Sequence, residues 1–277
     1  MVLGVDVSHA SPGVESPSMA SMVMSIDQNA CRYAAAVETN GYKVEMLTRA
    51  NINKFLDRLL PAFRKGTTIH QPQHVYYFRD GVSEGQFAQV IEYEVNEMKE
   101  RLRVDGVVPK FTVIVATKRH HIRFFPDRSC ADKNGNPLPG TLVERDVTHP
   151  FHWDFYLCSH LAIQGTARPV HYHVILDEAN CQPNELQRMI YEQCYMYARS
   201  TTAVSLHPAV YYAHLASSRA RAHDSVPQGG SDDAGYGSRA LAGSGDVRDS
   251  APLRPMGAEE DAHRDNIVFF PGTMWYI

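Results

Sequence analysis

The chain has 277 residues, enough for one large domain or two small ones, and 44% of them are hydrophobic, so a sizeable core can form. The formal net charge of −4 gives no global sign of nucleic-acid binding. Five scattered cysteines without a CxxC pair exclude a disulfide framework and a cysteine zinc site, and no export signal or apolar run of about 18 residues is present, so we expect a soluble, intracellular protein.

The first 80 residues predict four strands and one helix. An apolar strand covers residues 2–7, and strands at 18–26 and 32–38 form an antiparallel meander. Apolar side chains at spacings of three and four predict an amphipathic helix over 49–64, and a strand follows at 75–79. Because strand residues follow Met1 at once, we expect the chain to be a piece of a longer protein.

The rest of the chain predicts further strands and helices in a mixed order. Ser83 and Gln86 have the spacing of a capping box, which opens a helix that continues to Leu102. The remaining elements are a strand at 111–117, β-rich stretches at 141–148 and 153–158, a strand at 170–176, and helices at 183–199 and from Pro208 to about Arg221. This order indicates an α/β domain of three layers.

The segment 222–266 is rich in Gly, Ser and Asp and has no hydrophobic periodicity. It is typical of a disordered or mobile loop. Apolar residues at 267–270 and 273–277 indicate that order returns at the C-terminus.

Two aspartates each accompany a short apolar strand. Asp6 lies within the first strand, and Asp80 directly follows the strand at 75–79. A carboxylate is costly to bury in a sheet without a partner, and two on neighbouring strands would form a pocket for hard divalent cations. Such metal pairs cut phosphodiester bonds, so the pattern predicts a Mg²⁺-dependent nuclease. The alternative is that each aspartate caps a turn at the end of its strand.

Seven short motifs resemble, in the same order, the Piwi domain of eukaryotic Argonaute proteins. They are GVDVSH at 4–9, YFRDGVSEGQF at 77–87, KRHH at 118–121, YLCSH at 156–160, GTARP at 165–169, HYHV at 171–174 and YYAHL at 211–215. The resemblance runs from residue 2 to about 223, and residues 273–277 match the family's C-terminus. It implies that residues 1–277 are one Piwi domain with an RNase H-like fold, a mixed central β-sheet flanked by α-helices.

The same resemblance implies an activity and a cofactor. Family members hold a small guide RNA and cut a paired target RNA with divalent ions bound by an Asp-Glu-Asp-His tetrad. Asp6, Asp80 and His214 match three metal ligands, and Glu45 matches the glutamate that completes the catalytic set. Glu38 is a rival for Glu45 that requires a gap in the alignment. Two Mg²⁺ ions are expected, with Mn²⁺ as an alternative, and the products carry a 3′ hydroxyl and a 5′ phosphate.

Glu45 precedes the helix at 49–64, in a loop that would let it swing into the site. The alternative is that Glu45 is a solvated loop residue.

Basic residues match the family's contacts to the guide RNA. These are Lys118, Arg119, His121, Arg168, Arg199 and Arg219, joined by the C-terminal carboxylate of Ile277 near the guide 5′ phosphate. Arg219 follows His214 by five residues, about 140° around a helix, so the two would face different ligands. The alternatives are a solvated basic face, and charges that complement a helix dipole.

The expected partners follow from the resemblance. They are a guide RNA, a target RNA, the MID domain of the full-length protein and silencing partner proteins, with no membrane. The N, PAZ and MID domains of the family are missing from this sequence, so guide loading is expected to depend on them. The expected location is the cytoplasm, with the nucleus as the alternative. Two rival interpretations are a module that holds guide and target without cutting, and a truncated product that folds poorly by itself.

Overall fold

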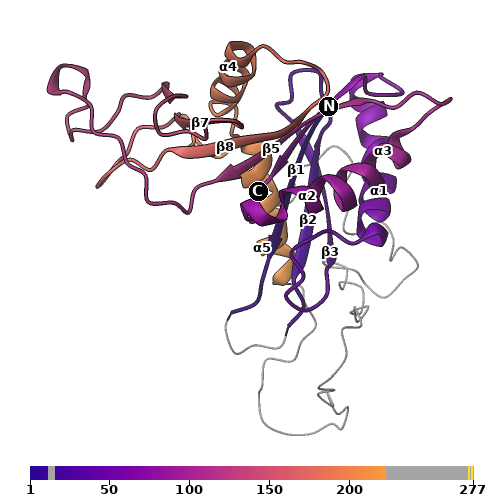
Figure 1. Cartoon of the computed structure of the whole chain (residues 1–277). Helices are drawn as coiled ribbons and strands as arrows, with labels where there is room; N and C mark the ends of the chain where they lie inside the picture. Colours follow the sequence, from indigo (N-terminus) through magenta and orange to yellow (C-terminus); the bar gives the residue numbers. More distant parts are fainter. Residues whose placement is uncertain (12–15, 223–273, 275, 277) are drawn as a thin grey trace, which may run out of the picture.

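The computed structural model describes residues 1–11, 16–222, 274 and 276 (Figure 1). The predicted loop at 222–266 lies outside the described residues except for Ala222, which ends the last helix. Residues 267–270, where order was expected to return, and the carboxylate of Ile277 also lie outside them.

Eight strands form one mixed sheet in the order β3-β2-β1-β4-β5-β8-β7-β6. They are β1 (Val2–Ser8), β2 (Met19–Ser25), β3 (Tyr33–Thr39), β4 (His74–Arg79), β5 (Lys110–Thr117), β6 (Thr141–Val143), β7 (Trp153–Cys158) and β8 (Val170–Asp177). β4 is parallel to its neighbours β1 and β5, and the other adjacent pairs are antiparallel. The predicted meander and mixed sheet are therefore confirmed.

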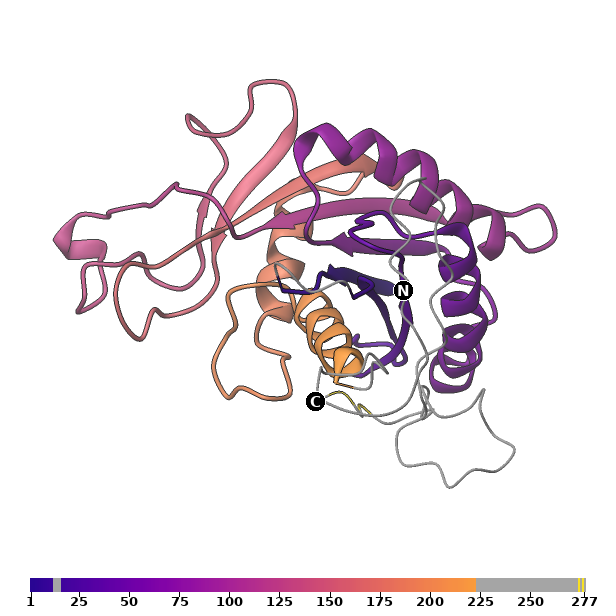
Figure 2. The same cartoon turned by 90° about the horizontal axis from the view of Figure 1, so that it is seen from below.

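Helices cover both faces of the sheet and give the predicted three layers. α1 (Arg49–Thr67) and α3 (Asn96–Leu102) bury Phe55, Leu59 and Met98 against one face. α4 (Pro183–Gln193) and α5 (Pro208–Arg221) pack on the other, where Ile190 and Val210 join a second core. Figure 2 shows the N-terminal strands between the orange α5 and the purple α1. The central strand β5 is buried on both sides, as its apolar sequence indicates.

The predicted helix at 83–102 forms with an irregular course. Gln86 accepts a hydrogen bond from the backbone N–H of Ser83, as expected of the capping box. The helix then passes through a 3₁₀ turn (Glu84–Gln86), a short α2 (Phe87–Gln89) and a π-helical segment (Val90–Val95) before α3 begins. The π-helical segment contains Glu94, which is fully buried.

Two predicted elements are shorter than expected. The helix predicted over 183–199 ends at Gln193 because Tyr197 packs against the rings of Tyr211 and Tyr212, and the N–H of Ala198 donates to the Tyr212 hydroxyl. Only residues 141–143 of the β-rich stretch at 141–148 pair as a strand. Within residues 1–11 and 16–222, no helix combines the length and apolarity needed to cross a bilayer.

Candidate active site

Asp6 and Asp80 lie side by side near the C-terminal ends of the neighbouring strands β1 and β4. β1 and β4 are parallel with Val5 opposite Arg79, and the N–H of Asp80 donates to the carbonyl of Val5 at 3.3 Å. The next residues, Asp6 and Asp80, therefore stand side by side on neighbouring strands. Burial, and then the charge of Asp6, raise the pKa of Asp80 to about 6. The pair forms an anionic pocket that favours a cation or a proton.

His214 of α5 lies next to Asp6. α5 packs closely on β1 at Gly4, where a Cβ would lie 2.4 Å from the carbonyl oxygen of Ala209. His214 Nδ1 lies 3.2 Å from Asp6 Oδ2, and this contact raises the pKa of His214. The hydroxyl of Ser217 donates to the same oxygen at 3.2 Å. Ser217 was not predicted as a site residue from the sequence, although its spacing of three from His214 places it one helical turn further on.

Glu45 already lies in the site. Its Oε2 is 2.7 Å from His9 Nε2, and its Oε1 accepts from Arg79 at 3.4 Å. Arg79 also donates to the backbone carbonyl of Glu45 at 2.6 Å. Burial raises the pKa of Glu45 despite the opposing effects of Arg79 and His9. The loop that was expected to swing is therefore anchored in this conformation by Arg79 and His9, which were not predicted as site residues.

Arg79 is a buried charge held by acids on two sides. Its side chain is fully buried, and it lies 3.3 Å from Glu94, which also accepts from the Tyr77 hydroxyl at 2.6 Å. Burial alone would lower the pKa of Arg79, but Glu94, Tyr77 and Glu45 together raise it, so the guanidinium stays charged. The position beside Asp80 is the one sequence signal that could have pointed to Arg79.

Glu38, the rival of Glu45, is occupied elsewhere. It is buried on β3 and forms an ion pair with Arg58 of α1 at 3.0 Å. Its ion pair with Arg58 favours a structural role for Glu38, and the choice of Glu45 as the catalytic glutamate stays a prediction.

One cavity of about 950 Å³ gathers the predicted catalytic residues with three basic ones. Its lining includes Asp6, Glu45, Asp80, His214, Lys118, Arg119 and Arg168. Among the described residues, His121, Arg199 and Arg219 lie outside this lining and are exposed. The structure therefore joins the tetrad with three of the predicted guide contacts and leaves three others on the surface.

The residues of this cavity fit a hard divalent cation. Three carboxylates supply oxygen ligands of the kind that Mg²⁺ prefers, and the cavity is open to the basic residues beside it. Among the described residues, three potential ligand atoms lie within 4.8 Å of one another at a different place, Asp154, His171 and His173. Asp6, Asp80 and His214 do not form such a group, although His214 Nδ1 lies 3.2 Å from Asp6 Oδ2.

The chain matches known proteins along most of its length. The profile of the Piwi domain family covers residues 1–225. Protein argonaute of Schizosaccharomyces pombe is 46% identical over 227 residues, which are 81% of this chain and 27% of that protein. The chain thus spans about a quarter of the length of this curated relative.

Solved structures share the fold. The C-terminal lobe of a budding yeast Argonaute has a TM-score of 0.74 at 35% identity, covering 79% of this chain and 46% of that one. Kluyveromyces polysporus Argonaute with a guide RNA has a TM-score of 0.73 at 34% identity, covering 79% of this chain and 28% of that one. The predicted RNase H-like fold and the resemblance to eukaryotic Argonautes are both confirmed.

Proposed function

Since this chain belongs to the Piwi domain family, we propose that it is the guide-RNA-directed, divalent-metal-dependent endoribonuclease domain of an Argonaute acting in RNA silencing. One observation supports this proposal above the others. Asp6, Glu45, Asp80 and His214 come from four separate segments of the sequence, yet they line one cavity together with Lys118, Arg119 and Arg168. Acidic side chains that can bind metal ions, beside basic side chains that can bind phosphates, suit the cavity to a phosphodiester backbone.

Each residue has a distinct task in the proposed reaction. Asp6, Asp80 and His214 would hold Mg²⁺ or Mn²⁺, and Glu45 would complete the catalytic set. When bound, two such ions lower the pKa of the attacking water and stabilise the leaving 3′ oxygen. Ser217 keeps the Asp6 carboxylate oriented, while Arg79 and His9 keep Glu45 in the cavity. Lys118, Arg119 and Arg168 would neutralise backbone phosphates without reading bases, which lets one site accept any sequence.

The proposed partners are RNA and protein. A guide RNA is present in the Kluyveromyces polysporus structure, and we infer that this chain holds a guide in the same way, with His121, Arg199, Arg219 and Ile277 as further contacts. A complementary target RNA, a MID domain and silencing partner proteins complete the proposed assembly. All five cysteines are free, which suits the reducing cytoplasm or nucleus.

The experiment places this chain behind the N-terminal part of a cutting Argonaute and adds a 5′-phosphorylated guide, a matched target RNA and Mg²⁺. We expect one sharp cut, which Asp80→Ala abolishes while target binding persists, because the change removes a metal ligand and no phosphate contact. Asp57→Ala, at an exposed aspartate of α1, is the matched control and should cut normally.

Two results would contradict the proposal. Cleavage that survives Asp80→Ala would remove Asp80 from the metal site. Tight target binding without any cut would instead favour a module that holds guide and target RNA and silences through other proteins.

A further inference from the structure

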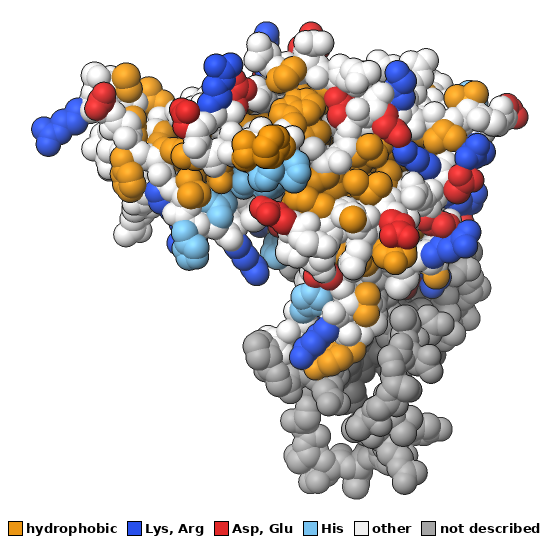
Figure 3. All heavy atoms as spheres, viewed as in Figure 1, with side chains coloured by type: hydrophobic (Ala, Val, Ile, Leu, Met, Phe, Trp, Pro, Cys, Tyr) orange, Lys and Arg blue, Asp and Glu red, His pale blue; other side chains and the backbone are white. Residues whose placement is uncertain are grey.

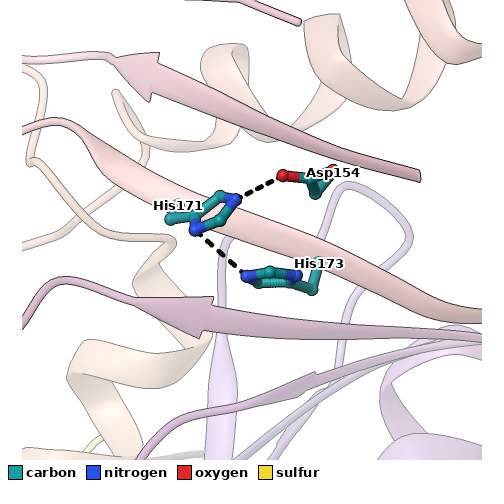
Figure 4. Close-up of side chains that lie close together, drawn as sticks. All are labelled: Asp154, His171 and His173. Carbon is teal, nitrogen blue, oxygen red and sulfur yellow. Dashed lines mark hydrogen bonds and ion pairs between the residues drawn. The ribbon is translucent and has the colours of Figure 1, made fainter. Parts of the chain in front are cut away.

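Asp154, His171 and His173 form a second group of potential metal ligands, outside the lining of the cavity that contains Asp6. His171 and His173 are two residues apart on β8 and so share one face of the sheet, and Asp154 of β7 lies opposite His173. Figure 4 shows the three side chains turned toward one another. Asp154 Oδ2 lies 2.6 Å from His171 Nε2, and His171 Nδ1 lies 3.0 Å from His173 Nε2.

Packing fixes these rings in place. The His171 ring stacks on Tyr156 with centroids 4.0 Å apart, and the His173 ring lies against Phe87 at 5.3 Å. The side chains of Asp154, His171 and His173 are 1%, 13% and 8% exposed, so little rotational freedom remains to be lost on binding. Figure 3 shows histidine side chains gathered on this face of the molecule.

The spacing of the ring nitrogens is close to that of a zinc site. Zn²⁺ binds histidine nitrogens at about 2.0–2.1 Å, so two nitrogens of a tetrahedral site lie roughly 3.3 Å apart. The observed 3.0 Å between His171 Nδ1 and His173 Nε2 is close to this spacing, and the rings must separate slightly and turn so that both nitrogens point at one ion. The other nitrogen of His171 faces Asp154, which reproduces the carboxylate–histidine–metal arrangement that orients metal-binding histidines.

Glu84 supplies a further oxygen near these nitrogens. Its Oε1 lies 4.0 Å from His173 Nε2, and its side chain is 78% exposed and therefore able to move inward. Glu84 opens the 3₁₀ turn just after Asp80, so a metal bound here would join β8 to the loop that leaves the candidate active site.

We propose that His171 Nδ1, His173 Nε2 and Glu84 bind one Zn²⁺ ion, with Asp154 orienting His171 and water in the remaining position. Imidazole ligands favour zinc and other late transition metals, whereas the carboxylates around Asp80 favour Mg²⁺, so the two sites select different ions. Binding replaces the hydrogen bond between the two rings, and the proton of His173 Nε2 moves to Nδ1 of the same ring, so that both metal-binding imidazoles stay neutral.

The test titrates the full chain with Co²⁺, a visible-absorbing substitute for Zn²⁺, in excess Mg²⁺ that fills the carboxylate site. We expect one equivalent of tetrahedral Co²⁺ that Zn²⁺ displaces and that is lost in His173→Gln. Asp154→Asn should weaken Zn²⁺ binding by about 10–100-fold, as measured against a chromophoric chelator. Glu84→Gln, which changes an exposed side chain and should leave the fold intact, should also weaken it.

Matched histidine variants distinguish Co²⁺ binding at this site from Co²⁺ binding at other histidines of the chain. His70→Gln, at an exposed histidine after α1, should bind as the unaltered chain does. Unchanged Co²⁺ binding in His173→Gln, or no binding by the unaltered chain, would overturn the proposal. So would loss of binding on His152→Gln alone, because His152 stacks on His149 and belongs to a different pair of rings.

Discussion

Asp80 must be charged to bind a metal, although its surroundings favour the neutral acid. Its pKa is about 6 in the folded chain against 3.8 for an ordinary aspartate. Between these values the folded state holds the proton more tightly than the unfolded state, so the free energy of unfolding falls as the pH rises through this window. The charged carboxylate thus costs about 3 kcal/mol of stability at neutral pH, from about two pKa units at roughly 1.4 kcal/mol each.

This cost can be removed by making residue 80 neutral. Without Mg²⁺, we expect Asp80→Asn to raise the free energy of unfolding by about 2–3 kcal/mol near pH 7, with the gain shrinking toward pH 4. The amide oxygen can still accept from the N–H of Gly81, which donates to Asp80 at 2.7 Å. Urea unfolding of both proteins at several pH values measures this gain in the free energy of unfolding. A gain that does not change with pH would show that the carboxylate is not the source of the cost.

Gly81 makes room for the Glu45 carboxylate. It has a φ of +81°, and a Cβ there would lie 2.8 Å from Glu45 Oε1. Gly81→Ala should therefore cost about 1–2 kcal/mol through backbone strain and also push Glu45 out of the cavity, which lowers target cleavage. Gly106 has a φ of +78° with nothing within 4 Å, so Gly106→Ala carries the strain alone. Equal cleavage by the two variants at saturating RNA would refute the role given to Gly81.

The packing of α5 on β1 brings His214 and Ser217 to Asp6. A Cβ at Gly4 would lie within 2.4–2.8 Å of three Ala209 atoms, so Gly4→Ala must push α5 away from the sheet. We expect a loss of about 1–3 kcal/mol in the free energy of unfolding, which is typical of overpacking. Weaker Mg²⁺ binding should accompany it, because the contact between His214 and Asp6 lengthens. Gly85→Ala, with nothing within 4 Å of its Cβ, is the control, and equal Mg²⁺ affinity in both would contradict the argument.

The sequence predicted those elements whose hydrophobic pattern is local. Apolar runs located β1, β4 and β5, and the spacing of Phe55 and Leu59 located α1. The end of α4 at Gln193 was not predictable, because distant tyrosines of α5 draw Tyr197 out of the helix. The π-helical segment was missed for a similar reason, since Glu94 is buried there by its contacts with β4.

The candidate site also has a part that was predicted from the sequence and a part that was not. Motif resemblance predicted the tetrad, and its four residues line one cavity. The partners that orient it were missed, because His9, Arg79 and Ser217 acquire their contacts only when separate elements pack. The spacing of Ser217 from His214 indicates only a shared face of α5, and its hydrogen bond to Asp6, which lies 211 residues away, requires the packing of α5 on β1.

For the whole molecule, the position of charges matters more than their sum. The chain has a formal net charge of −4, yet Lys118, Arg119 and Arg168 line the same cavity as the acids. A cation bound by those acids would reverse the local sign and add to the basic residues. RNA binding should therefore depend on a few well-placed phosphate contacts and not on the net charge of the chain.

The dependence of RNA affinity on salt concentration reports the number of these phosphate contacts. Each phosphate contact to a single strand contributes about 0.7 to the slope of log affinity against log salt, so Arg168→Ala should reduce that slope by about 0.7. The loss should be equal for RNAs of different sequence, because backbone contacts read no bases. Fluorescence anisotropy with 5′-phosphorylated RNA between about 50 and 200 mM salt measures the slope. Arg188→Ala, at an exposed arginine paired with Glu192 on α4, should leave it unchanged, and an unchanged slope in Arg168→Ala would exclude a phosphate contact there.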